Sequence, residues 1–121
     1  MKDSILEFIV KFSEGEDPLE TAVTLTVGGL LISGHVISKA KYMQHNILTE
    51  KIQEGIEQAI AASGEEAPSD DGERHFIHLR DARYFSPGQP PTPSNEKITC
   101  RIKLSNVSAF HLGYLDVQGE A

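Results

Sequence analysis

The chain has few or none of the features that mark several classes of protein. It contains 121 residues with a single cysteine and no tryptophan. Cys100 therefore has no partner for a disulfide within the chain, which agrees with a reducing compartment. No stretch reaches the roughly 20 apolar residues of a transmembrane helix, and the N-terminal segment lacks the long apolar core of a secretory signal. We therefore expect a soluble, cytoplasmic protein that does not enter a membrane.

Basic residues are also in the minority. The chain has 11 Lys and Arg against 18 Asp and Glu, which gives a net charge of −7. An acidic protein disfavours non-specific nucleic-acid binding, because contacts to phosphates need a cationic surface. Nucleic acid is therefore not an expected partner, although Arg80, Arg83, Arg101 and Lys103 leave a local basic face on the late strands open.

The clearest pattern lies in residues 23–37, VTLTVGGLLISGHVI. Residues 23–27 alternate between apolar and polar, whereas residues 30–37 are apolar on both parities. Gly28-Gly29 separates the two halves, and glycines tolerate the positive φ angles of a two-residue hairpin turn. The pattern predicts a hairpin whose first strand has one solvated face and whose second strand is covered on both faces.

Two amphipathic helices are predicted around this hairpin. Residues 3–13 place their apolar side chains on one helical face, and Asp3 or Ser4 is expected to cap the start. The second helix is predicted over about residues 40–62, because apolar side chains recur every four positions in its second half and Gly64 is a natural stop. The residues of this second stripe are Leu48, Ile52, Ile56 and Ile60.

Three further strands are expected later in the chain. Residues 74–80 form the first, followed by a turn at Asp81-Ala82 and a short extension through Phe85; residues 97–104 and 109–115 form the others. An acidic loop at about 64–73 and a proline-rich loop at about 86–95 interrupt them, and a frayed tail begins at Gly119. We expect one domain over residues 1–121, with an α+β fold. Its sheet is a small bent five-stranded mainly antiparallel sheet or an Sm-like barrel, with an N-terminal helix and one inserted helix.

No group of residues in the sequence supports catalysis or metal binding. His75 and His78 are three apart on a predicted strand, so they point to opposite faces. Ser33, His35 and Asp81 contain the residue types of a catalytic triad, but no nucleophile elbow or oxyanion donor pair accompanies them. The glycine pair is not followed by the Lys-Ser/Thr of a phosphate loop. We expect no enzyme, no metal and no cofactor.

Contact surfaces are therefore the expected functional feature. Leu31 and Ile37 should face away from the core, where either the helix over residues 40–62 or another subunit covers them. The N-terminal helix either covers one end of the sheet or docks on a partner, and Tyr84-Phe85 either plugs the sheet or contacts a partner. The candidate partner-binding residues are Ile5, Phe8, Ile9, Phe12, Leu31, Ile37, Tyr84 and Phe85.

Three stretches carry a family resemblance: LTVGGLLISGHVIS at 25–38, FIHLRDARYFSPG at 76–88 and IKLSNVSAFHLGYL at 102–115. Together with the helix before them and the helical insert between the first two, they resemble the gas vesicle accessory proteins of the GvpU family. The resemblance implies a non-enzymatic, cytoplasmic bacterial protein that assists the assembly of gas vesicles or organises and clusters finished ones. Its implied partners are gas vesicle proteins or further copies of itself, as a homo-oligomer. None of the three stretches is a catalytic motif.

The alternative function is an Sm-like RNA-binding module that uses Arg80, Arg83, Arg101 and Lys103. The late hairpin reads IKLSNVSAFHLG, where Sm-like RNA binders carry an Arg-Gly pair. A compact sheet with exposed apolar residues agrees better with a self-associating adaptor, because many weak contacts gain avidity on a repetitive surface.

Overall fold

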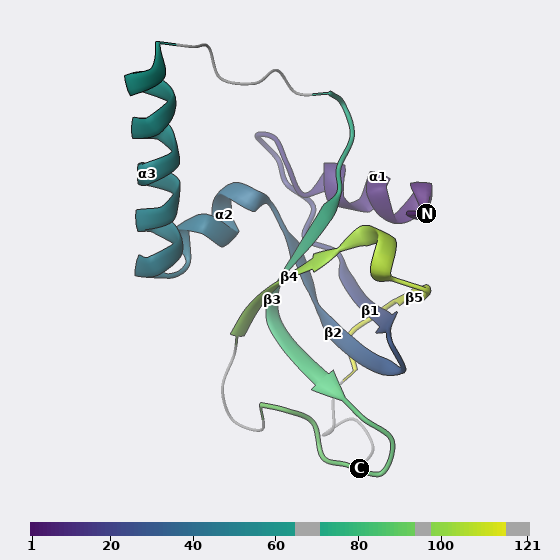
Figure 1. Cartoon of the computed structure of the whole chain (residues 1–121). Coiled ribbons are helices and arrows are strands. Elements are labelled where there is room, and N and C mark those ends of the chain that lie inside the picture. The colour runs from purple at the N-terminus through teal and green to yellow at the C-terminus, as the bar shows by residue number, and fades with distance from the viewer. Residues whose placement is uncertain (65–70, 94–97, 116–121) are drawn as a thin grey trace.

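A five-stranded antiparallel sheet forms the body of the molecule in the computed structural model, which describes residues 1–64, 71–93 and 98–115 (Figure 1). The strand order is β4-β3-β2-β1-β5, and no pairing between the edge strands β4 and β5 closes the sheet within these residues. The strands are β1 Ala22–Val27, β2 Leu30–Ile37, β3 Phe76–Phe85, β4 Ile98–Lys103 and β5 Ala109–Leu112. The predicted α+β fold is confirmed, in the form of an open sheet.

The central hairpin forms as predicted. Gly28 and Gly29 have φ angles of 57° and 80°, and Val27 pairs directly with Leu30 across the turn. The prediction that one face of β1 is solvated is wrong at Thr24, because this residue is buried. Its hydroxyl lies 3.1 Å from the Ser33 hydroxyl and donates to the carbonyl of Gly113 at 2.9 Å, so the polar side chain is satisfied inside the protein.

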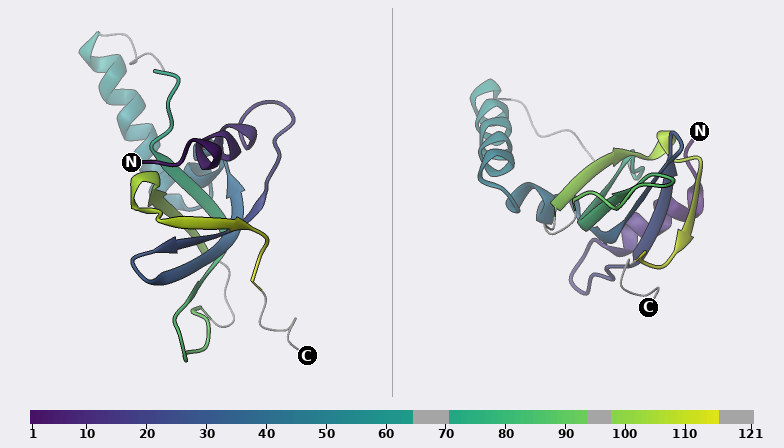
Figure 2. Two further views of the ribbon diagram at one scale, coloured as in Figure 1. Left: turned by 90° about the vertical axis from the view of Figure 1, so that its right-hand side faces the viewer. Right: turned by 90° about the horizontal axis from the view of Figure 1, so that it is seen from below.

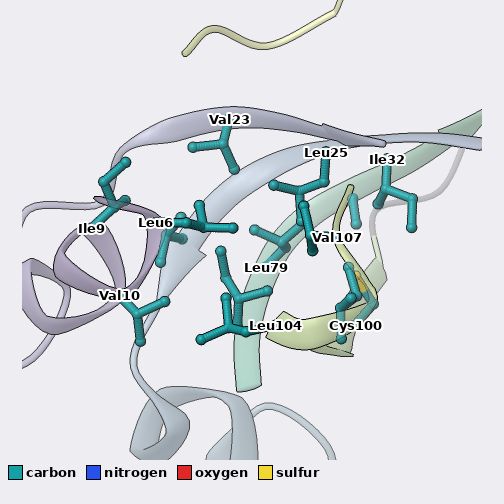
Figure 3. Close-up of a cluster of buried hydrophobic side chains, with 14 residues drawn as sticks. Leu6, Ile9, Val10, Val23, Leu25, Ile32, Leu79, Cys100, Leu104 and Val107 are labelled. Atoms are coloured by element: carbon teal, nitrogen blue, oxygen red, sulfur yellow. The ribbon is translucent and has the colours of Figure 1, made fainter. Parts of the chain in front are cut away.

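Helix α1, Ser4–Phe12, packs one of its sides onto the sheet. Asp3 caps the helix, because its Oδ1 accepts hydrogen bonds from the amides of Ile5 and Leu6. Figure 3 shows the helix side chains meeting those of the strands in one apolar cluster. This core consists of Leu6, Ile9, Val10, Val23, Leu25, Ile32, Val36, Ile77, Leu79, Ala82, Cys100, Ile102, Leu104 and Val107.

The chain does not turn at Asp81-Ala82, so that prediction is wrong. Strand β3 continues through both residues, and Asp81 adopts a positive φ of 53°. The register between β3 and β4 shifts between Leu79 and Ala82, which identifies a β-bulge. Asp is one of the few residues other than glycine that tolerate a positive φ. Asp81 therefore suggested a turn in the sequence, whereas in the structure its positive φ forms a bulge.

The helix predicted over residues 40–62 is two helices. Helix α2, Lys39–Gln44, ends at His45, and helix α3, Ile47–Ser63, begins after Asn46. The Asn46 side chain accepts a hydrogen bond from the amide of Leu48 at 2.7 Å, which caps the new helix and separates it from α2. Gly64 ends α3 with a φ of 73°, as predicted. No helix within the described ranges is long and apolar enough to cross a membrane.

Helix α3 does not cover the sheet. It contacts α2, which in turn contacts β3, and none of its residues is buried. The right-hand view of Figure 2 shows α3 standing away from the sheet. The expectation that this segment covers Leu31 and Ile37 therefore fails for α3.

Part of the predicted loop structure falls outside the described residues. Positions 65–70 of the acidic loop, 94–97 at the end of the proline-rich loop and 116–121 at the tail are in this group. A 3-10 helix, Leu104–Asn106, connects β4 to β5.

Gly34 is expected to be the least replaceable glycine of the sheet. A Cβ at this position would lie 3.0 Å from the Leu79 Cβ and 3.1 Å from the Arg80 carbonyl oxygen, where β2 and β3 shift register. Because one neighbour is backbone, Gly34→Ala should lower the free energy of unfolding by about 1–3 kcal/mol. Urea titration measures this loss. Gly55→Ala is the control, since a Cβ at Gly55 has no neighbour within 4 Å. Equal stability of Gly34→Ala and the wild type would contradict the close approach.

Candidate functional site

Helix α1 is apolar on two sides. Its inner side, with Leu6, Ile9 and Val10, is buried in the core. Its outer side exposes Ile5, Phe8 and Phe12 by 64%, 58% and 55%. Leu19 is also exposed, and its amide donates to the carbonyl of Phe12 at 2.8 Å, so it extends the same surface. We call Ile5, Phe8, Phe12 and Leu19 the α1 face.

Helix α3 carries a second exposed apolar surface. Leu48, Ile52 and Ile56 are exposed by 65%, 47% and 47%, and Ile60, which is partly exposed, continues the row at the same spacing. We call these four residues the α3 stripe. An amphipathic helix normally turns such a stripe to the core of its own protein. Most of the stability of helices in proteins comes from packing of such a face, so the unpacked stripe is a candidate surface for a partner.

The polar side of α3 is the side that faces its own protein. Glu50, Gln53, Glu54 and Glu57 line a cleft of about 430 Å³ between α3 and α2. The helix therefore turns its carboxylates toward α2 and its isoleucines to solvent. The sequence revealed the periodicity of the stripe, but it could not reveal which side of the helix would meet the sheet.

The eight predicted contact residues fall into two groups. Ile5, Phe8 and Phe12 are exposed on the α1 face, whereas Ile9 and Ile37 are buried, with Ile37 only 3% exposed. Ile9 and Ile37 are thus a correction to the expected surface. Ile9 lies on the inner side of α1, and Ile37 lies at the end of β2, where the chain enters α2 and α2 packs against β3.

The remaining three predicted residues lie at the edge of the core. Leu31 is partly exposed and pairs with Phe85 across β2 and β3, and Phe85 is also partly exposed. Tyr84 packs against the core, and its burial raises the pKa of the phenol to about 12. The main chain of Tyr84 forms hydrogen bonds with Thr92. Tyr84 and Phe85 therefore belong to a strand that is bonded to the proline-rich loop.

Ion pairs connect α1 to the segment before β3. The guanidinium of Arg74 donates to both carboxylate oxygens of Glu14, with Nε 2.9 Å from Oε2, and the amide of Arg74 donates to Glu7 at 2.6 Å. That amide and the ammonium of Lys2 hold the pKa of Glu7 below its usual range. These contacts fix the orientation of α1 on the sheet and so position the α1 face.

The basic residues of the RNA-binding alternative do not form a free cationic surface together. Arg80 is paired with Glu20 at 2.9 Å and with Asp81 at 2.7 Å. Arg101 stacks on the ring of Phe76 with 3.8 Å between the guanidinium carbon and the ring centroid. Among the described residues the structure therefore offers no support for an Sm-like RNA site.

The residues of the possible triad hold the fold together. Ser33 is buried, and its hydroxyl accepts a hydrogen bond from the amide of Leu115 at 2.7 Å. The ring of His35 stacks on Tyr114 with 5.2 Å between centroids, and burial lowers the pKa of His35. Asp81 pairs with Arg80. Each group is occupied by a structural contact.

One group of possible metal ligands occurs in the described part of the chain. Ligand atoms of Asp71, Glu73 and His75 lie within 4.8 Å of one another, and all three residues are exposed. The amide of Glu73 donates to Asp71 at 2.8 Å and holds the pKa of that carboxyl below its usual range. A solvated acidic turn explains this arrangement without an ion.

Comparison with known proteins identifies the family. No curated protein and no solved structure matches the chain significantly. The model of the family described as "Gas vesicle protein GvpU-like" matches residues 3–115, which extend from the cap of α1 to beyond β5. This match covers nearly the whole chain and confirms the resemblance carried by the three sequence stretches. The chain belongs to the GvpU-like family of gas vesicle proteins.

Proposed function

We propose that this protein is a non-enzymatic accessory protein of gas vesicles that organises vesicles by self-association and by contacts with vesicle proteins, in the cytoplasm of a bacterium. The family supports the connection to gas vesicles. The observation that carries the proposal is the pair of exposed apolar surfaces, the α1 face and the α3 stripe, on two separate helices.

The two surfaces suit weak and repeated contacts. Each consists of four apolar side chains on one helix or its adjoining turn, which is far less than the roughly 20–30 residues per partner of a stable interface. Figure 1 shows α1 and α3 on different sides of the molecule, so one copy can contact two neighbours. Bivalent weak contacts produce open assemblies, and on a vesicle surface they gain strength through avidity.

Charge favours contact between the α1 face of one copy and the α3 stripe of another. Helix α3 carries Glu50, Glu54 and Glu57 against the single Lys51, so two copies of α3 repel each other through their net charge, although these glutamates face α2 and do not border the stripe. The α1 face is bordered by Lys11, whose ammonium lies 5.7 Å from the centroid of the Phe8 ring. Lys11 gives the α1 face a positive charge, which the net negative charge of a neighbouring α3 attracts at long range.

Purified gas vesicles test the function. The protein should float with the vesicles during centrifugation, and the particle size measured by light scattering should rise as the vesicles cluster. A protein that remains monomeric, does not float with vesicles and leaves their particle size unchanged would overturn the proposal.

The matched control for this test lies on the same helix. Gln58→Glu with Ala61→Glu adds two charges to exposed positions of α3 outside the stripe. This double variant should float with the vesicles and cluster them as the wild type does.

A further inference from the structure

A cavity of about 510 Å³ lies between α1, α2 and the strands β3 and β4. Val10 and Phe76 give it apolar walls. Its polar lining has both signs of charge, with Lys39, Arg74, Arg101 and the histidines His75 and His78 beside Glu14 and Glu73. Its size is within the range of small-molecule sites, which combine apolar walls with a few convergent polar groups. The proposed self-association does not use this cavity.

Two cations of the cavity have no acidic partner. The guanidinium of Arg74 is occupied by Glu14, whereas neither Lys39 nor Arg101 forms an ion pair within the described residues. Arg101 stacks its guanidinium on the ring of Phe76 at 3.8 Å. Stacking uses the flat face of the guanidinium, so the N–H groups at its edge remain available to an anionic group.

His78 adds a buried donor to this pair of cations. It is 4% exposed, it lines the cavity, and its Nε2 has no hydrogen-bond partner within the described part of the chain. The ring packs against Tyr42 of α2 with 4.8 Å between centroids, so its orientation is fixed. A buried polar atom without a partner is costly, and an acceptor in the cavity would remove that cost.

We propose that this cavity binds the phosphate group of a small phosphate monoester. Lys39 and Arg101 supply the positive charge, and the Nε2–H of the neutral His78 donates the third contact. Donors on three separate side chains suit the three terminal oxygens of a phosphate, whereas a carboxylate presents only two oxygens in one plane. Val10 and Phe76 contact the organic part of the ligand.

The positive electrostatic potential that Arg101 and Lys39 produce at His78 favours an anionic ligand. Burial lowers the pKa of His78 to about 4, and the charges of Arg101 and Lys39 act in the same direction. A phosphate between these cations would oppose their effect. Because Lys39 is the first residue of α2, the ligand would also connect the α2 and α3 arm to the sheet.

Calorimetric titration of the full-length protein tests the site with phenyl phosphate and inorganic phosphate as probes, at constant ionic strength set with sodium chloride. Phenyl phosphate should bind saturably and more tightly than inorganic phosphate. In NMR spectra of the same titration, the ring resonances of His78 should shift. Arg101→Gln and Lys39→Gln should each weaken binding by about tenfold or more. Lys103→Gln, two residues along β4 and outside the cavity, should bind as the wild type does.

Three outcomes would overturn the proposal. They are no saturable binding of either probe, equal binding of the two probes, and equal loss of binding in Lys103→Gln and Arg101→Gln. Urea midpoints of the variants identify any loss that comes from unfolding. Because the titration contains no vesicles, its failure is separate from a failure of vesicle clustering.

Discussion

Replacing Ile52 and Ile56 by glutamate is expected to abolish self-association while the protein stays folded. Both side chains are 47% exposed, and α3 buries none of its residues. Their removal takes nothing from the core, so the free energy of unfolding should change by no more than about 0.5 kcal/mol. The two charges make the α3 stripe unsuitable for an apolar contact. Sedimentation velocity over a concentration series should show a monomer at every concentration.

A second variant identifies the surface that the stripe contacts. Phe8→Glu with Phe12→Glu disrupts the α1 face and keeps the α3 stripe intact. Each double variant should be monomeric alone, and an equimolar mixture of the two should form a heterodimer, because one supplies the intact stripe and the other the intact face. The control variant with Gln58→Glu and Ala61→Glu should associate as the wild type does.

Two results would contradict this pairing. Self-association of the Phe8 and Phe12 variant by itself would indicate that α3 pairs with α3. Wild-type association of the Ile52 and Ile56 variant would exclude the stripe as a contact surface.

The parts of the fold that depend on local chemistry could be predicted from the sequence. Gly28-Gly29 specifies a two-residue turn through its positive φ angles, and the alternation in residues 23–27 specifies a strand. Gly64 ends α3 because its conformation is left-handed. Asn46 also gives a local signal, since Asn is a favoured N-cap, but the prediction did not use it and extended one helix back to residue 40.

The parts that depend on distant partners could not be predicted. The period of Leu48, Ile52 and Ile56 indicates an apolar side, but it does not say whether the sheet or another molecule meets that side. Thr24 illustrates the same limit within the sheet. Alternation predicted solvent around it, whereas the hydroxyl of Ser33 on β2 and the carbonyl of Gly113 after β5 satisfy it inside the protein.

His78 was predicted to face away from His75, and its exposure could not be judged from the strand pattern alone. The two residues do differ: His75 is exposed, whereas His78 is buried. The ring of Tyr42 lies against His78 because α2 packs on β3, a contact between segments more than 30 positions apart in the sequence. The apolar character of α1 was predictable from its own sequence, whereas the choice of its buried side and the environment of His78 required the assembled fold.

The buried His78 is expected to make stability depend strongly on pH. Burial, with the charges of Arg101 and Lys39, lowers its pKa in the folded protein to about 4, below the ordinary value of 6.5. The unfolded chain therefore binds this proton first, so stability is complete above about pH 6.5 and falls as the pH drops toward 4. The loss should approach about 1.4 kcal/mol per pH unit within that window.

Urea titrations from about pH 7 to about pH 5 test this expectation, because most carboxylates remain ionised over that range. His78→Gln should lower the slope of stability against pH. It should not remove the slope, because burial also lowers the pKa of His35 and gives a contribution of the same sign. His45→Gln, at an exposed position after α2, should keep the wild-type slope. A wild-type slope in His78→Gln would contradict a buried neutral histidine, because removal of that group must remove its share of the linked proton uptake.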